Sequence, residues 1–135
     1  MMDMNHDQQK DHARLNKEIA VSFLQLVASG RVREAYNTYI SPDFCHHNPY
    51  FRGDANSLMI AMEENASKNP DKSFEVKRVI AEGNLVAVHS HVKQKPEDLG
   101  VAVVHIMRFE NHIIVEMWDL GHPVPENSPN EYGIF

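Results

Sequence analysis

The stretch VAVVHIMRFENHIIVEMWDL, residues 101–120, decides the fold class of this chain. Two apolar runs flank the pair Asn111-His112, which predicts two antiparallel strands joined by a short polar loop. The second run ends near Asp119, directly after Trp118. A carboxylate in such apolar company is either paired, solvated at a rim, or raised in pKa by desolvation. The third case would suit it to general acid/base chemistry.

Length and composition favour one globular domain over residues 1–135, with residues 1–10 expected to be flexible. Hydrophobic residues make up 42% of the chain and charged residues 24%, as in ordinary globular proteins. The apolar runs are too short to cross a bilayer, and the polar N-terminus does not read as a signal peptide. Cys45 is the only cysteine, which favours the reducing cytoplasm. A net charge of −6 argues against nucleic acid as a partner.

Helices are expected in the first half of the chain. Apolar residues recur at helical spacing from residue 11 to 29, and a second helix is predicted over 31–39. A third helix is predicted over 57–67, with Asn56 as its N-cap. Residues 43–53 are interpreted as a short extended piece and a loop.

The second half of the chain predicts β-structure. Strands are expected over 74–80 and 85–93, followed by the two strands of residues 101–120. The fold class is therefore α+β, with three N-terminal helices packed on an antiparallel sheet of four long strands. If the sheet curves strongly, it encloses a cone-shaped cavity against the helices.

Five short segments carry a resemblance to a known family. They are His46-His47-Asn48-Pro49, Gly53, EGNLVAVH at 82–89, VVHIMRFE at 103–110 and VEMWD at 115–119. In order and spacing they resemble the SnoaL-like polyketide cyclases, which have the nuclear transport factor 2-like fold. The resemblance implies a cone-shaped α+β barrel that acts without a cofactor. It also implies acid/base catalysis of an intramolecular aldol condensation, or isomerisation as in ketosteroid isomerases.

Asp119 matches the main acid/base carboxylate of that family, while several other polar positions differ. The chain has His105 where the family commonly has Asp, Met117 where it has His, and His122 where it tends to have Gln. The hairpin carries Asn111-His112 in place of Asp-Gly. The resemblance therefore implies a scaffold and a catalytic carboxylate, but no particular substrate.

The position of His105 depends on the register of the hairpin. A two-residue turn at Asn111-His112 puts His105 opposite Trp118, on the other face from Asp119. A three-residue loop at 110–112 puts His105 opposite Met117, so that His105 and Asp119 share one face. We favour the second register because it gathers the family's polar positions. His105 is then either the catalytic partner of Asp119 or a packed histidine.

The other candidate residues are expected to bind substrate in the cone. His89 matches a family histidine, and His47 lies in a loop expected at the cone mouth, with His46 solvated. His89 and His91 point the same way on one strand and could contribute to a zinc or iron site. The other histidines are scattered, so we expect no metal. The resemblance to the family implies that no cofactor is needed. The full substrate-binding set is His47, His89, Met117, Trp118, Val103, Tyr36 and Met62.

Two functions fit this sequence. The first is a small enzyme that transfers protons on an apolar carbonyl compound, with Asp119 as base and His105 assisting. The second is a non-catalytic module that binds an apolar ligand in the same cone. A broad apolar outer face on the sheet also predicts a homodimer. The residues assigned to that face are Val86, Val88, Val104 and Ile106.

Overall fold

The computed structural model describes residues 5–135, so the flexibility expected for residues 1–4 lies outside the described residues. Within the described part, the three helices lie in the first half of the chain, four of the five strands follow them, and this segregation confirms the α+β class. No helix among these residues is both long enough and apolar enough to cross a membrane. The elements are α1 (His6–Ala28), α2 (Val32–Tyr39), β1 (Ile40–His46), α3 (Ala55–Lys68), β2 (Ser73–Glu82), β3 (Leu85–Lys93), β4 (Val101–Glu110) and β5 (Ile113–Pro123).

Side-chain caps set where two of the helices begin. Asn5 accepts a hydrogen bond from the Gln8 amide at 2.8 Å, and the Gln8 side chain accepts one from the Asn5 amide at 3.1 Å. This capping box starts α1 at residue 6, so residues 6–10 belong to the helix, which begins earlier than the predicted start at residue 11. In α3 the N-cap is Asp54, whose carboxylate accepts from the Ser57 amide at 2.9 Å. The prediction of Asn56 as the cap was therefore wrong, because Asn56 already lies inside the helix.

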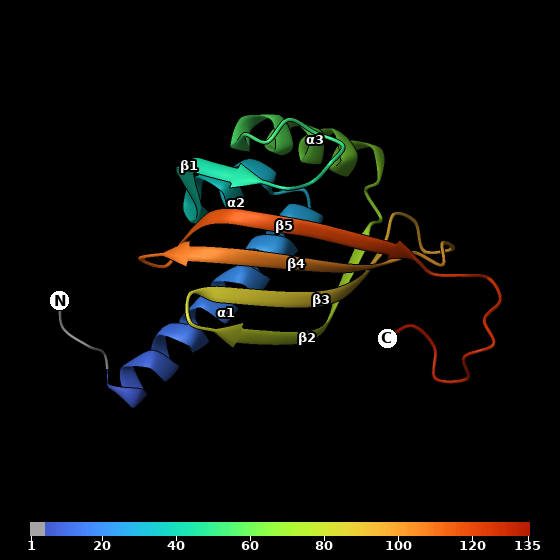
Figure 1. The fold of residues 1–135 in the computed structure, drawn as a ribbon. Coiled ribbons are helices and arrows are strands. Elements are labelled where there is room, and N and C mark those ends of the chain that lie inside the picture. Colours follow the sequence, from blue (N-terminus) through green and yellow to red (C-terminus); the bar gives the residue numbers. More distant parts are fainter. Residues whose placement is uncertain (1–4) are drawn as a thin grey trace.

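The sheet has the strand order β1-β5-β4-β3-β2, and the three helices pack on one of its faces (Figure 1). The four predicted strands are confirmed and pair antiparallel. The fifth strand, β1, was expected only as a short extended piece. It runs parallel to β5, with Cys45 opposite Glu116 and His46 opposite Met117. Its partner is distant in sequence, and no local pattern encodes such a pairing.

The β4–β5 hairpin closes with a two-residue turn. Glu110 pairs with Ile113, and both intervening residues are left-handed, with φ of 51° at Asn111 and 65° at His112. Positive φ at both central positions is typical of a type I′ turn. The three-residue loop that we favoured is therefore wrong.

A bulge at Val115 corrects the register that this turn alone would impose. Phe109 pairs with Ile114 and Arg108 with Glu116, which leaves Val115 as an extra residue on β5. The one-residue shift brings His105 opposite Asp119. The two side chains consequently share one face, as expected, although neither register that we considered contains the bulge.

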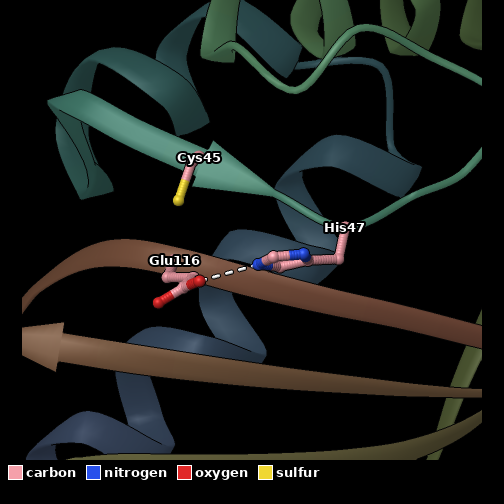
Figure 2. Close-up of side chains that lie close together, drawn as sticks. All are labelled: Cys45, His47 and Glu116. Carbon is pink, nitrogen blue, oxygen red and sulfur yellow. Dashed lines mark hydrogen bonds and ion pairs between the residues drawn. The ribbon is translucent and has the colours of Figure 1, made fainter.

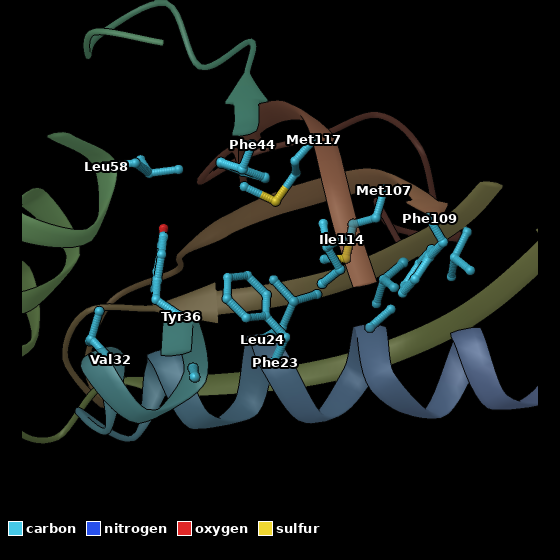
Figure 3. Close-up of a cluster of buried hydrophobic side chains, with 14 residues drawn as sticks. Phe23, Leu24, Val32, Tyr36, Phe44, Leu58, Met107, Phe109, Ile114 and Met117 are labelled. Atoms are coloured by element: carbon cyan, nitrogen blue, oxygen red, sulfur yellow. The ribbon is translucent and has the colours of Figure 1, made fainter. Parts of the chain in front are cut away.

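The hydrophobic core lies between the helices and the inner face of the sheet (Figure 3). Phe23 of α1 and Tyr36 of α2 meet edge to face, with ring centroids 5.3 Å apart. Val86 and Val88 are 1% and 0% exposed and belong to this core. Their assignment to the outer face was wrong, because the pleat of β3 turns its even-numbered residues inward at this point.

The start of β4 depends on the absence of a side chain at Gly100. Gly100 has a φ of +84°, and a Cβ built there would lie 2.3 Å from the Val92 carbonyl oxygen. We expect Gly100→Ala to cost more than about 3 kcal/mol of unfolding free energy, because strain and overlap add. Gly83→Ala is the matched control, since φ is +59° there but no atom lies within 4 Å.

Urea denaturation of the two variants and the wild type measures this difference. Gly83→Ala should lose only about 1–2 kcal/mol, the cost of a left-handed alanine. Equal losses at the two positions would contradict the steric role of Gly100.

Candidate functional site

A buried histidine and a partly exposed carboxylate lie together on the inner face of the sheet. His105 Nε2 of β4 is 3.5 Å from Asp119 Oδ1 of β5. The side chain of His105 is 11% exposed and that of Asp119 22%, so solvent reaches the carboxylate more readily than the imidazole. The predicted juxtaposition of these two residues is present, with a geometry suited to exchange of a proton through a small movement or a bound group.

Asn48 holds the other oxygen of the carboxylate. Its Nδ2 donates to Asp119 Oδ2 at 2.8 Å, while its Oδ1 accepts from the Tyr50 amide at 3.0 Å. The second bond sets the orientation of the side-chain amide, so the donor end faces Asp119. Sequence reasoning noted the Asn48-Pro49 motif without giving Asn48 a role. The sequence does contain one indication of this role. Asn favours turns in which its side chain accepts a hydrogen bond from the backbone amide two residues later.

The surroundings of His105 favour its neutral form. Burial lowers the pKa of the His105 imidazole, the nearby Asp119 carboxylate opposes this, and the Lys72 ammonium reinforces it. His105 Nδ1 is buried and has no hydrogen-bond partner among residues 5–135. Since burial is the largest of these causes, we take the neutral imidazole as the form present at neutral pH.

Two further polar groups surround Asp119. Burial raises the pKa of the Tyr36 hydroxyl and the Asp119 charge raises it further, so Tyr36 remains a protonated donor. Burial lowers the pKa of Lys72, an effect that the Asp119 charge opposes. Lys72 Nζ donates to Asn65 Oδ1 at 2.8 Å. Lys72 was not among the predicted site residues, because a lysine in a polar turn has no distinguishing pattern in the sequence.

The predicted substrate-binding residues divide between the two faces of the sheet. Tyr36 and Met117 are buried in the core beneath the inner face, and Met62 packs against that core. Val103 is half-buried and shares the inner face with His105. These four lie on the side of the sheet that carries Asp119.

His89 and Trp118 lie on the outer face. Arg78 donates to His89 Nδ1, and the Phe135 ring lies 5.8 Å from the His89 ring. Trp118 stacks on His47 with ring centroids 5.0 Å apart. The prediction that His89 and Trp118 line the cone is therefore incorrect, because each neighbours an inward-facing residue along its strand.

The two adjacent histidines of the motif have the reverse of the expected arrangement. His46 is 5% exposed; its Nδ1 accepts from the Asn48 amide at 3.1 Å, and its Nε2 donates to the Arg52 carbonyl at 2.5 Å. His47 is about half exposed, and its Nε2 is 2.7 Å from Glu116 Oε2. β1 continues through His46, so alternation turns His46 inward and His47 outward.

Two pockets border the inner layer. The larger, of about 590 Å³, lies between the start of α1 and the hairpin tips. A smaller one of about 230 Å³ is lined by Lys72 and Phe74 together with Gln25, Ala28 and Ser29. Phe74, which lines the smaller pocket, has its ring centroid 6.1 Å from that of His105. Neither Asp119 nor His105 itself lines these two pockets.

Comparison with known families gives one match. A model of the SnoaL-like domain matches residues 20–117, which is most of the chain but ends two residues before Asp119. No curated protein matches the chain by sequence.

Solved structures with the same fold are numerous but distant in sequence. An NTF-2-like protein of unknown function from Burkholderia xenovorans is 21% identical, with a TM-score of 0.69 and 90% of each chain covered. A proposed ketosteroid isomerase from Kribbella flavida is 15% identical, with a TM-score of 0.68, covering 91% of this chain and 90% of that one. A proposed polyketide cyclase from Acidithiobacillus ferrooxidans is 19% identical, with a TM-score of 0.66, 79% of this chain and 87% of that one. At these identities the likeness shows the fold.

The electrostatics of His105 predict a pH dependence of stability. Folding disfavours the charged imidazole, so below the unfolded pKa of about 6.5 the unfolded chain gains a proton that the folded chain resists. Wild-type protein should therefore lose unfolding free energy relative to His105→Gln as the pH falls from about 7 to 5. Urea midpoints across that range measure it, with the exposed His122→Gln as matched control. A wild type that gains stability relative to His105→Gln on acidification would instead indicate an ion pair with Asp119.

Proposed function

The chain belongs to the SnoaL-like domain family, and we propose that it is a cofactor-independent enzyme that transfers protons on an apolar carbonyl compound. Solved relatives include proteins named as a polyketide cyclase and a ketosteroid isomerase, which supports a cyclase or isomerase reaction. One observation carries the proposal. Asp119, the proposed base, and His105, a second proton carrier, lie 3.5 Å apart beside the hydrophobic core.

In the proposed reaction Asp119 removes a proton from the carbon next to the substrate carbonyl. The C–H bond breaks, the proton passes to the carboxylate, and the electron pair moves to the carbonyl oxygen. Asn48 holds Oδ2, which leaves Oδ1 on the side of His105 to accept the proton. In an isomerisation Asp119 returns the proton to another carbon. In an aldol cyclisation the enolate carbon bonds to the carbon of a second carbonyl, whose oxygen takes the proton that Asp119 had accepted, and the carboxylate is regenerated.

The neutral state of His105 suits this role. A cationic imidazole would stabilise the Asp119 anion and weaken it as a base. A neutral imidazole can donate a hydrogen bond to developing negative charge on oxygen, and the protonated Tyr36 hydroxyl offers a second donor nearby. Met117 and Val103 provide apolar surface on the same side for the hydrocarbon part of the substrate.

Asp119→Asn tests the base directly. The change keeps the size of the side chain and removes its basicity, so we expect turnover to fall by about 10²–10⁴-fold with ligand affinity changed only a few-fold. The measurement is exchange of the carbon-bound proton for deuterium, followed by NMR. It uses any small molecule that co-purifies, identified by denaturing mass spectrometry, and a panel of apolar ketones. Asp71→Asn, in an exposed turn, is the matched control. Full exchange activity in Asp119→Asn would overturn the assignment.

A non-catalytic binding module is the second candidate function. The observation that favours it is the saturation of Asp119 by partners, since Asn48 bonds one oxygen and His105 lies beside the other. A structural carboxylate would have such partners too. The same exchange assay separates the two functions, because a module binds its ligand without accelerating exchange in the wild-type protein.

We further propose that the protein forms a homodimer through the outer face of the sheet. Ile80 and Leu120 are 65% and 60% exposed there, beside Val104 and Ile106. The end of the chain covers part of this face, since Phe135 lies 4.4 Å from the His91 ring. We expect light scattering to give a dimer at micromolar concentration and Leu120→Asp to shift it towards monomer. A monomeric wild type would overturn the proposal.

A further inference from the structure

Three potential metal ligands converge at the β1 edge of the sheet, on its outer face. Cys45, His47 and Glu116 lie with their donor atoms within 4.8 Å of one another (Figure 2). Among residues 5–135, no other group of three such side chains meets that criterion. The group differs from the His89 and His91 pair that the sequence suggested, whose rings contact Arg78 and the Leu99 carbonyl instead.

The backbone places these three side chains together. Cys45 and His47 are two residues apart at the end of β1, so they point to the same side. The parallel register puts Cys45 opposite Glu116, and the His47 amide donates to the Met117 carbonyl at 2.9 Å. Main-chain hydrogen bonds between two adjacent strands therefore fix the backbone positions of the three potential ligands.

We propose that Cys45 Sγ, His47 Nε2 and Glu116 bind one Zn²⁺ ion or a similar borderline divalent cation. A sulfur, an imidazole nitrogen and a carboxylate oxygen together are typical zinc ligands, whereas magnesium and calcium prefer oxygen alone. Three protein ligands leave a fourth tetrahedral position for water, and the exposure of Cys45 and His47 keeps that side open to solvent.

Only small side-chain movements are needed to bind the ion. Zinc bond lengths of about 2.0–2.3 Å imply donor–donor separations of roughly 3.4–3.6 Å in a tetrahedral site. His47 Nε2 and Glu116 Oε2 are 2.7 Å apart, and all three donor atoms lie within 4.8 Å of one another. Binding would lengthen the separation between His47 Nε2 and Glu116 Oε2 by less than about 1 Å, while the strands stay in place.

Neighbouring residues support two of the ligands. Arg108 Nε donates to Glu116 Oε1 at 3.0 Å, which leaves Oε2 for the ion and orients the carboxylate. Arg108 also bonds Glu110 at 3.1 Å, so its charge is shared between two carboxylates. The Trp118 ring stacks on His47 with an interplanar angle of 6° and limits the orientations of the imidazole. These contacts orient His47 and Glu116 in the folded chain before an ion arrives.

The proposed zinc site is independent of the proton-transfer site. Glu116 lies on the outer face of β5, whereas Asp119 lies on its inner face. The inference therefore does not depend on the enzymatic function proposed above.

The test is a titration of the reduced, tag-free protein with Zn²⁺ in competition with a chromophoric chelator. We expect one ion per chain in the wild type. Removing a residue that only hydrogen-bonds to a metal ligand already costs about 10-fold or more in metal affinity. Cys45→Ser and Glu116→Gln change ligands themselves, so each should weaken zinc binding by at least about tenfold. The control variant His122→Gln removes an exposed histidine outside the proposed site and should bind zinc as the wild type does. Circular dichroism confirms that each variant is folded.

Cobalt substitution reports on the ligands themselves. Co²⁺ bound by Cys45 should give a thiolate-to-metal charge-transfer band in the near ultraviolet, absent from Cys45→Ser and present in His122→Gln. The proposal is overturned if the wild type binds no zinc, which would leave the group as an ion-pair network only. It is also overturned if Cys45→Ser and Glu116→Gln keep wild-type affinity, which would place bound zinc elsewhere.

Discussion

The pairing of β4 with β5 is the constraint on which the rest of the structure depends. Because side chains alternate along a strand, a slip of one residue would exchange the inner and outer faces of β5. The bulge at Val115 sets which residues of β5 face inward after it, and it brings Asp119 opposite His105. The same register puts Glu116 outward beside Arg108, where it meets the side chains of β1.

The inner face combines an apolar core with a small number of polar groups, and some of these groups have no hydrogen-bond partner among the described residues. His105 Nδ1 and Ser90 Oγ are buried without hydrogen-bond partners among residues 5–135. Leaving buried polar atoms unpaired costs free energy, and such groups concentrate at functional sites. Asp119 in contrast is held by Asn48 and remains partly exposed. Burial favours the uncharged form of all three of its neighbours: it raises the pKa of the Tyr36 hydroxyl and lowers the pKa of Lys72 and of His105.

The end of β1 contributes side chains to both faces of the sheet. Phe44 and His46 point inward, where His46 bonds the Arg52 carbonyl and the Asn48 amide. These bonds shape the loop that presents Asn48 to Asp119. Cys45 and His47 point outward to Glu116. The end of β1 and the residue that follows it thus place His46 on the inner face and two potential metal ligands, Cys45 and His47, on the outer face, because successive side chains alternate.

Local pattern in the sequence determined the α+β class and the approximate spans of α2, α3 and β2 to β5. The choice of Asp119 and His105 also rested on the resemblance to the SnoaL-like family. Apolar periodicity and turn residues act over a few positions, so they can be read from the chain directly. Only the tertiary structure decided the pairing of β1 with β5, the bulge at Val115 and the contact of Asn48 with Asp119. The structure also places His89, Trp118 and His47 on the outer face, whereas the sequence had suggested that they line the cone. The β1–β5 pairing and the Asn48–Asp119 contact join segments distant in sequence, which local patterns do not encode. The bulge at Val115 lies within one hairpin, but its single extra residue changes which side chains meet, and apolar alternation does not reveal it.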